Sequence, residues 1–106
     1  MNKYGLHGKL NAQAGRGNEL ASILLQASAL VSTAKGCHLY LVSKDAADAD
    51  CIWITEVWDT REDHDKSLHL DGVGALISQA IPLLAGKPEK GLELEVLGGL
   101  PKHIPA

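Results

Sequence analysis

A chain of 106 residues with 45% hydrophobic and 22% charged residues has the composition of one folded domain, which we take as residues 1–106. The net charge of −3 predicts no binding to nucleic acid or to anionic membranes, and the apolar runs are too short to cross a bilayer. Two cysteines do not make a disulfide framework and the N-terminus lacks a signal-peptide segment, so we expect a cytoplasmic protein.

The first half of the chain predicts a strand, a helix and a hairpin. Apolar residues alternate over residues 4–11, which indicates a strand. Asn18 is the expected N-cap of a helix over residues 19–34, whose apolar residues recur at helical spacing. Residues 37–44 and 51–59 predict two further strands, and the short acidic connection between them makes them an antiparallel hairpin.

The second half predicts a helical region in two pieces. Thr60 and Asp63 have the spacing of a capping box, which begins a helix that extends to about residue 70. A second helical piece over residues 73–84 contains Pro82, which should kink or end it.

Alternating Leu and Glu residues predict a fourth strand over residues 92–97. The order β-α-β-β-α-β predicts an α+β, ferredoxin-like fold, in which one antiparallel sheet carries its helices on one face. The core then spans about residues 4–98 and is followed by a tail over residues 99–106.

Both faces of the predicted hairpin are largely apolar. If Lys44 pairs with Cys51, one face carries Cys37, Leu39, Leu41, Ile52, Ile54, Glu56 and Trp58, and the other carries His38, Tyr40, Val42, Trp53, Thr55 and Val57. A slip of one residue would exchange the two faces and leave both apolar. Because helices cover only one face, the other predicts a two-fold homodimer.

The sequence contains no recognisable metal or nucleotide motif. His64 and His69 are five residues apart and do not share a helix face, so the spacing of a zinc-binding pair is absent. There is no P-loop and no complete dinucleotide fingerprint. In the hairpin, Cys37 and Cys51 lie at opposite ends, opposite Trp58 and Lys44, so we expect two free thiols and no metal site.

Several residues near the end of the third strand could form an aromatic-binding pocket. His38 on the second strand could lie near Trp58 and His64, where a neutral imidazole takes a proton from a phenol and an indole provides a flat wall. Each histidine could instead have a structural role, and Trp53 could be a core or dimer contact. Glu56 is either a paired structural acid or a general acid or base with a raised pKa.

The segment from Trp53 to His64 resembles the antibiotic biosynthesis monooxygenase family, whose members carry a Glu-x-Trp strand end and a His about six residues later. The opening of the second strand, residues 36–40, is similar to the family's Gly-Cys followed by an aromatic residue. Residues 4–10, which lead into Ala14-Gly15, are similar to its first strand and turn, and the resemblance covers about residues 4–98.

The resemblance implies a dimeric α/β barrel and, for some members, a cofactor-free monooxygenase that oxidises quinols or polycyclic phenols with O2. A base takes a proton from the substrate, and the electron-rich anion passes an electron to oxygen. Here His64 or His38 would be the base or the anion stabiliser, and Trp58 the wall and possible donor. The candidate substrate-binding residues are Tyr40, Glu56 and His69.

Two other functions stay open on the same fold. One is the isomerisation of a small oxygenated metabolite without O2; a phosphorylated substrate would need cationic pocket residues, and Arg16 and Arg61 are the only arginines. The other is a dimer that binds a small ligand without turnover. Haem degradation is disfavoured, because Ser67 and Ile77 stand where haem-degrading relatives use a Trp and a His.

Overall fold

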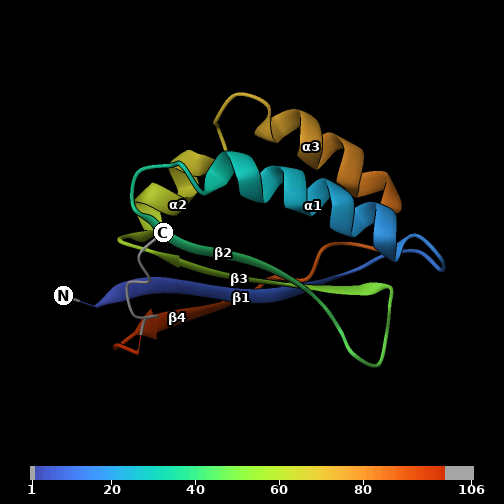
Figure 1. The fold of residues 1–106 in the computed structure, drawn as a ribbon, viewed down its shortest axis with the longest axis horizontal. Helices are drawn as coiled ribbons and strands as arrows, with labels where there is room; N and C mark the ends of the chain where they lie inside the picture. Colours follow the sequence, from blue (N-terminus) through green and yellow to red (C-terminus); the bar gives the residue numbers. More distant parts are fainter. Residues whose placement is uncertain (1, 100–106) are drawn as a thin grey trace, which may run out of the picture.

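The computed structural model describes residues 2–99. The elements are, in chain order, β1 (Lys3–Asn11), α1 (Gly17–Val31), β2 (Cys37–Lys44), β3 (Cys51–Trp58), α2 (Arg61–Ser67), α3 (Val73–Ala80), the 3-10 turn η1 (Ile81–Leu83) and β4 (Leu92–Val96). The four strands form one antiparallel sheet in the order β2-β3-β1-β4, and the helices lie over one face of it (Figure 1). The predicted α+β, ferredoxin-like fold is confirmed.

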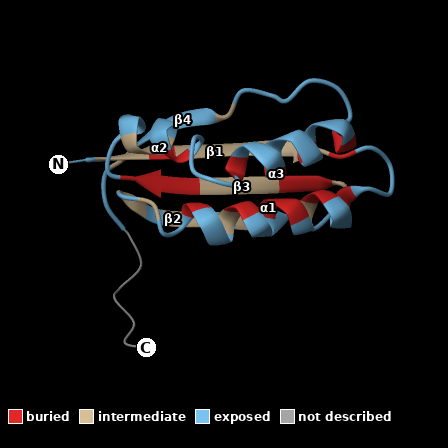
Figure 2. Cartoon of the chain, turned by 90° about the horizontal axis from the view of Figure 1, so that it is seen from above, coloured by how far each residue is buried: buried red, intermediate tan, exposed pale blue. Residues whose placement is uncertain are grey.

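The hydrophobic core lies between the helices and the middle of the sheet. Seen from above, buried residues lie at both ends of β3, with partly buried ones between them, and along one side of α1 (Figure 2). Leu20 on α1 and Ile52 on β3 are fully buried in the larger cluster, whereas Trp58 is the centre of a smaller one. Pro82 lies in η1 just after α3, so it ends the helix as predicted. Within residues 2–99, no helix has the length and hydropathy to cross a bilayer.

The N-terminus of α1 is capped from a distant turn. The Asp50 carboxylate accepts the N–H of Gly15 at 3.0 Å and that of Gly17 at 2.9 Å. The expectation that Asn18 is the N-cap is wrong, because Asn18 lies inside α1 and its side-chain oxygen accepts a hydrogen bond from Lys44. The helix begins earlier than predicted because the turn before β3 supplies the carboxylate that satisfies its first N–H groups.

The register of the β2–β3 hairpin differs from the predicted one. The expected pairing of Lys44 with Cys51 is wrong, because Lys44 pairs with Ile52. The pairing of Cys37 with Trp58 at the other end is as predicted. The two ends fit together because β2 accommodates one extra residue at a β-bulge directly after Cys37. Both cysteines are free, as predicted.

The bulge decides which residues of β2 face the helices. His38 is the extra residue, and after it Tyr40 faces the helices beside Glu56 and Trp58. The sheet face that the helices leave uncovered is still largely apolar, but it is made by a different set of residues from the one predicted. That uncovered face carries His7, Leu39, Leu41, Trp53, Thr55, Val57, Leu92 and Leu94, and Lys3, Lys9 and Ser43 also lie on it.

Candidate functional site

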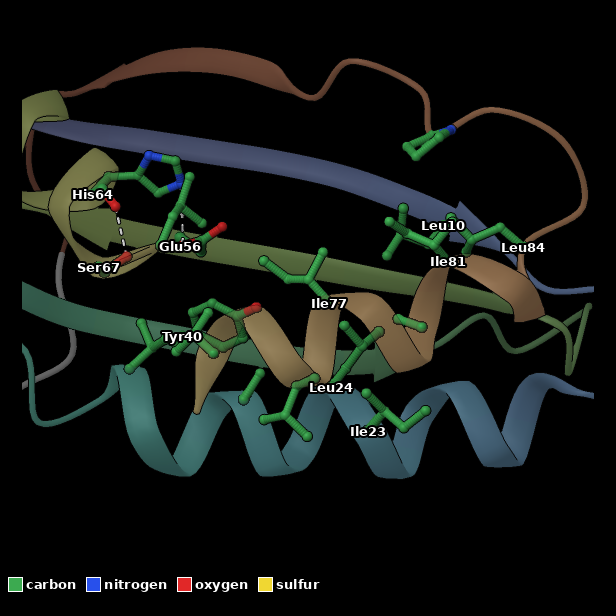
Figure 3. Close-up of a pocket in the computed structure, with 17 residues that line it drawn as sticks. Leu10, Ile23, Leu24, Tyr40, Glu56, His64, Ser67, Ile77, Ile81 and Leu84 are labelled. Atoms are coloured by element: carbon green, nitrogen blue, oxygen red, sulfur yellow. Dashed lines mark hydrogen bonds and ion pairs between the residues drawn. The ribbon is translucent and has the colours of Figure 1, made fainter. Parts of the chain in front are cut away.

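A cavity of about 180 Å³ lies between the sheet and the helices. Its walls come from α1, α2, α3 and the helix-facing side of the sheet (Figure 3). Most of the lining is aliphatic, including Leu10, Ile23, Leu24, Ile77, Ile81 and Leu84. The polar side chains of the lining are Tyr40, Glu56, His64 and Ser67. An apolar cavity with a few convergent polar groups is the usual form of a small-molecule site.

His64 is held at one end of the cavity by α2. The Thr60 hydroxyl accepts the Asp63 N–H at 3.1 Å, which caps this helix as the sequence predicts. The His64 side chain is only 13% exposed, and its Nδ1 lies 2.9 Å from Oδ1 of Asp65. In the tautomer that donates from Nδ1 to Asp65, Nε2 is left as a proton acceptor directed toward Glu56.

Glu56 projects from β3 into the same end of the cavity. The Trp58 indole N–H donates to Glu56 Oε1 at 3.0 Å, and His64 Nε2 lies 3.8 Å from the same oxygen. Burial raises the pKa of Glu56, and the Trp58 hydrogen bond and the nearby His64 offset this only in part. Glu56 therefore binds a proton more tightly than an exposed glutamate, which suits a group that exchanges protons with an imidazole.

Tyr40 completes the polar end of the cavity from β2. It is the backbone pairing partner of Glu56, so both side chains lie on the same side of the sheet. Burial first, and then the charge of Glu56, raises the pKa of Tyr40. The phenol therefore stays protonated at neutral pH and can donate a hydrogen bond to a ligand oxygen.

Trp58 lies behind the polar end rather than in its wall. Its side chain is fully buried and does not line the cavity, and its ring meets the edge of His64 at a centroid distance of 5.9 Å. Its contacts therefore position Glu56 and His64 and do not form the flat wall expected from the sequence.

His38 and His69 lie apart from this site. His38 is exposed at the bulge, where its Nε2 lies 2.6 Å from Asp59, and that contact together with Lys3 lowers the pKa of Asp59. His69 is exposed in the turn between α2 and α3. Neither histidine lines the cavity, whereas His64, Tyr40 and Glu56 do, with Trp58 behind them in contact with Glu56.

Two neighbours of His64 were missed by the sequence analysis. Tyr4 on β1 lies against the His64 ring at a centroid distance of 5.8 Å, and its hydroxyl donates to Glu93 at 3.0 Å. Asp65 orients the imidazole through Nδ1. Tyr4 reaches this place because β1 pairs with β3, with Tyr4 opposite Trp58, and no local pattern in the sequence signals that pairing. Within residues 2–99, no three His, Cys, Asp or Glu side chains are grouped to hold a metal ion.

A model of the antibiotic biosynthesis monooxygenase family matches residues 4–78 of the chain. A comparison with curated proteins found no match. Among solved structures, a candidate antibiotic biosynthesis monooxygenase from Chloroflexus aurantiacus is 40% identical to the chain. The alignment covers 92% of this chain and 95% of that one, with a TM-score of 0.81.

Two further structures extend the comparison to lower identity. A candidate antibiotic biosynthesis monooxygenase from Deinococcus radiodurans is 27% identical over 97% of this chain and 99% of its own, with a TM-score of 0.71. Another from Nitrosomonas europaea is 14% identical over 90% of each chain, with a TM-score of 0.83. At 14% identity the likeness shows the fold alone.

Proposed function

The chain belongs to the antibiotic biosynthesis monooxygenase family, and we propose that it is a homodimeric, cofactor-independent monooxygenase that oxidises a quinol-like or polycyclic phenol with O2. The observation that supports this most strongly is the apolar cavity in which Tyr40, Glu56 and His64 converge at one end. A phenol needs a base at its oxygen and apolar walls around its ring, and the cavity has both.

In the proposed reaction, His64 Nε2 takes the proton of the substrate hydroxyl, and Asp65 holds the imidazole in the required tautomer. The phenolate then gives one electron to O2, and the two radicals combine at a ring carbon. The proton taken by His64 returns to the peroxide so formed, which restores the base. The hydroperoxide then loses water together with the hydrogen of the ring carbon and leaves a carbonyl group, so one oxygen atom enters the product and the other leaves in the water. The apolar lining keeps bulk water from the anion while it reacts.

Tyr40 and Glu56 have separate roles in this proposal. The Tyr40 hydroxyl donates a hydrogen bond to the substrate oxygen and stabilises its negative charge. Glu56 takes the proton from His64, because its raised pKa brings its proton affinity closer to that of an imidazole. Once His64 Nε2 has taken the substrate proton, its N–H donates to Glu56 Oε1, for which the present 3.8 Å separation of the two atoms has to shorten. His38, the other base considered from sequence, is disfavoured because it does not line the cavity.

The homodimer in this proposal forms through the uncovered face of the sheet. Leu41, Leu92 and Leu94 on that face are 48%, 63% and 49% exposed. Beside them Trp53 stacks on His7 at a centroid distance of 5.0 Å. A broad apolar sheet face of this kind favours burial against a second copy of itself about a two-fold axis.

Oxygen consumption by metal-free protein tests the proposed reaction. Alkylated single-ring hydroquinones, naphthohydroquinones and anthrahydroquinones are supplied in turn, and the rate with each is corrected for its autoxidation. His64→Ala should lower the corrected rate by about 100-fold or more, the usual size of a general-base contribution. Lys66→Ala, an exposed substitution on the same helix, is the matched control and should retain the rate.

Three results would contradict the proposal in different ways. An unchanged rate in His64→Ala would remove the base assignment. Product formed without O2 would favour an isomerase of an oxygenated metabolite instead. Binding without any turnover would favour a ligand-binding dimer.

A further inference from the structure

The two ends of the cavity differ in polarity. Figure 3 shows His64, Ser67, Glu56 and Tyr40 at one end, and Leu84 with aliphatic neighbours at the other. No polar side chain of the lining lies near the Leu84 end (Figure 3). A ligand that fills the cavity therefore finds hydrogen-bonding side chains at one end only, so its oxygen atoms belong at that end and its apolar body lies against the aliphatic walls.

The cavity is long compared with its volume. Tyr40 lines the polar end of the cavity and pairs with Glu56 of β3, whereas Leu10 lines the other end and pairs with Ile52 of β3. Glu56 and Ile52 are four residues apart on β3, so at roughly 3.3 Å per strand residue the two ends are about 13 Å apart. Cavities of about 150 Å³ accept a single benzene ring, so a volume of about 180 Å³ spread over this length has little room for fused rings.

The types of lining side chain also change along the cavity. Tyr40 and His64 are its aromatic side chains, and both lie at the polar end. An aromatic ring of a ligand gains from stacked or edge contacts with such neighbours. Apart from Glu56 and Ser67, the remaining lining is built from apolar, non-aromatic side chains, which suit a flexible hydrocarbon chain as well as a ring.

The same aliphatic wall explains exposed apolar residues on the helix side of the molecule. Leu68, Ile77 and Ile81 are 44%, 41% and 57% exposed, and all three line the cavity. A hydrocarbon chain that lies along the cavity would cover part of them and remove that area from water.

We propose that the ligand of this cavity is a single-ring phenol or quinol that carries a short aliphatic chain. The ring lies between Tyr40 and His64 with its hydroxyl toward His64 Nε2, and the chain runs past Leu24 and Ile77 toward Leu84. The proposal that such a phenol is the substrate rests on the proposed monooxygenase function. It narrows the range of expected substrates from polycyclic phenols to single-ring phenols with an alkyl chain. The proposal that such a phenol binds in the cavity can be tested whether or not the protein turns it over.

Calorimetric titration with 4-alkylphenols, from methyl to octyl, tests the inference without a reaction. We expect affinity to rise roughly fourfold for each added CH2, the value of burying one methylene, until the chain reaches the Leu84 end. Beyond that length the affinity should level off. Anthracen-2-ol, a fused-ring phenol of comparable apolar area, should bind more weakly than the best alkylphenol.

Two variants test where the aliphatic chain of the ligand lies in the cavity. Ala80 lines the cavity near η1, so Ala80→Leu should lower the affinity for long-chain phenols by tenfold or more and leave 4-methylphenol nearly unchanged. Ala27 lines it beside Ser28, whose hydroxyl donates to the Tyr40 carbonyl, so Ala27→Leu should weaken short and long ligands alike. Thermal unfolding of each variant confirms that the fold is retained.

The results distinguish this inference from the proposed reaction. The inferred ligand class would be overturned if affinity did not depend on the length of the alkyl chain, or if anthracen-2-ol bound more tightly than the best alkylphenol. It would also be overturned if Ala80→Leu lowered the affinity for all ligands equally, or if no phenol bound. Chain-dependent binding with no oxygen uptake from alkylhydroquinones would support the ligand class and contradict the monooxygenase.

Discussion

Glu56 is a carboxyl group enclosed mainly by apolar side chains, with an indole N–H and an imidazole as its polar neighbours. From sequence it had two interpretations, a paired structural acid or an acid-base group with a raised pKa. The structure supports both, because Trp58 supplies the partner and burial raises the pKa. A buried carboxylate without full compensation costs folding free energy, which is typical of functional sites.

Glu56→Gln should therefore raise the free energy of unfolding at neutral pH. Burial raises the folded-state pKa of Glu56 above its ordinary value of 4.5, so wild-type stability is fully present below that value and falls as pH rises through the folded pKa. Glutamine stays neutral and still accepts the Trp58 N–H. Urea unfolding across the range from about pH 4 to about pH 8 should show a gain that grows with pH.

The control for this measurement is Glu62→Gln, which changes an exposed carboxylate on α2. Such a surface change should alter stability by about 0.5 kcal/mol or less. Parallel pH profiles of wild type and Glu56→Gln would show that this carboxylate carries no burial penalty.

The site residues show what sequence can and cannot place. His64 and Glu56 were predicted because they flank one strand end, and a short local segment fixes their relation. His38 was expected nearby, but the bulge turns it toward Asp59, and a bulge depends on two strands rather than on one. Tyr4 was missed because its contact with His64 exists only after β1 pairs with β3.

At the scale of elements, strands and helices were predicted well because their apolar periods are local properties of the chain. The start of α1 was not, because its cap comes from Asp50, more than thirty residues away in sequence. The β2–β3 register failed for the same reason, since one residue inserted after Cys37 shifts the pairing of every residue beyond it.

Replacing Asp50, which caps α1 from a distant turn, should destabilise the protein more than replacing Asn18, the N-cap predicted from the local sequence. Asp50→Ala removes the acceptor of two N–H groups at the start of α1 and should cost about 1 kcal/mol. Asn18→Ala, which removes an exposed contact with Lys44, should cost less. Urea unfolding measures the free energy of unfolding of both variants. A larger decrease in Asn18→Ala than in Asp50→Ala would contradict the assignment of Asp50 as the main cap of α1.

At the scale of the whole molecule, the helices cover one face of the sheet and leave the other open. The sequence predicted an open apolar face from the composition of the hairpin, and such a face is present. It is built from Leu39, Leu41 and Val57 together with β1 and β4, because the bulge exchanged the two sides of β2.

Leu41→Asp places a charge on the open face and should convert the proposed dimer to a monomer. An unpaired charge buried between two copies costs several kcal/mol, which is enough to reverse association at micromolar concentration. Sedimentation velocity measures the change. Leu25→Asp is the matched control, because Leu25 is similarly exposed at 58% but lies on α1. A wild-type mass of one chain would exclude the dimer.

The bulge at His38 has a consequence beyond the register. It lies on β2, which is an edge of the sheet, and there it interrupts the regular row of N–H and C=O groups that an added strand would need. The opposite edge, β4, is five residues long and carries Glu93 and Glu95. Both edges thus disfavour the addition of a strand from another molecule. The open apolar face can therefore be used for the proposed dimer without edge-to-edge growth into fibrils.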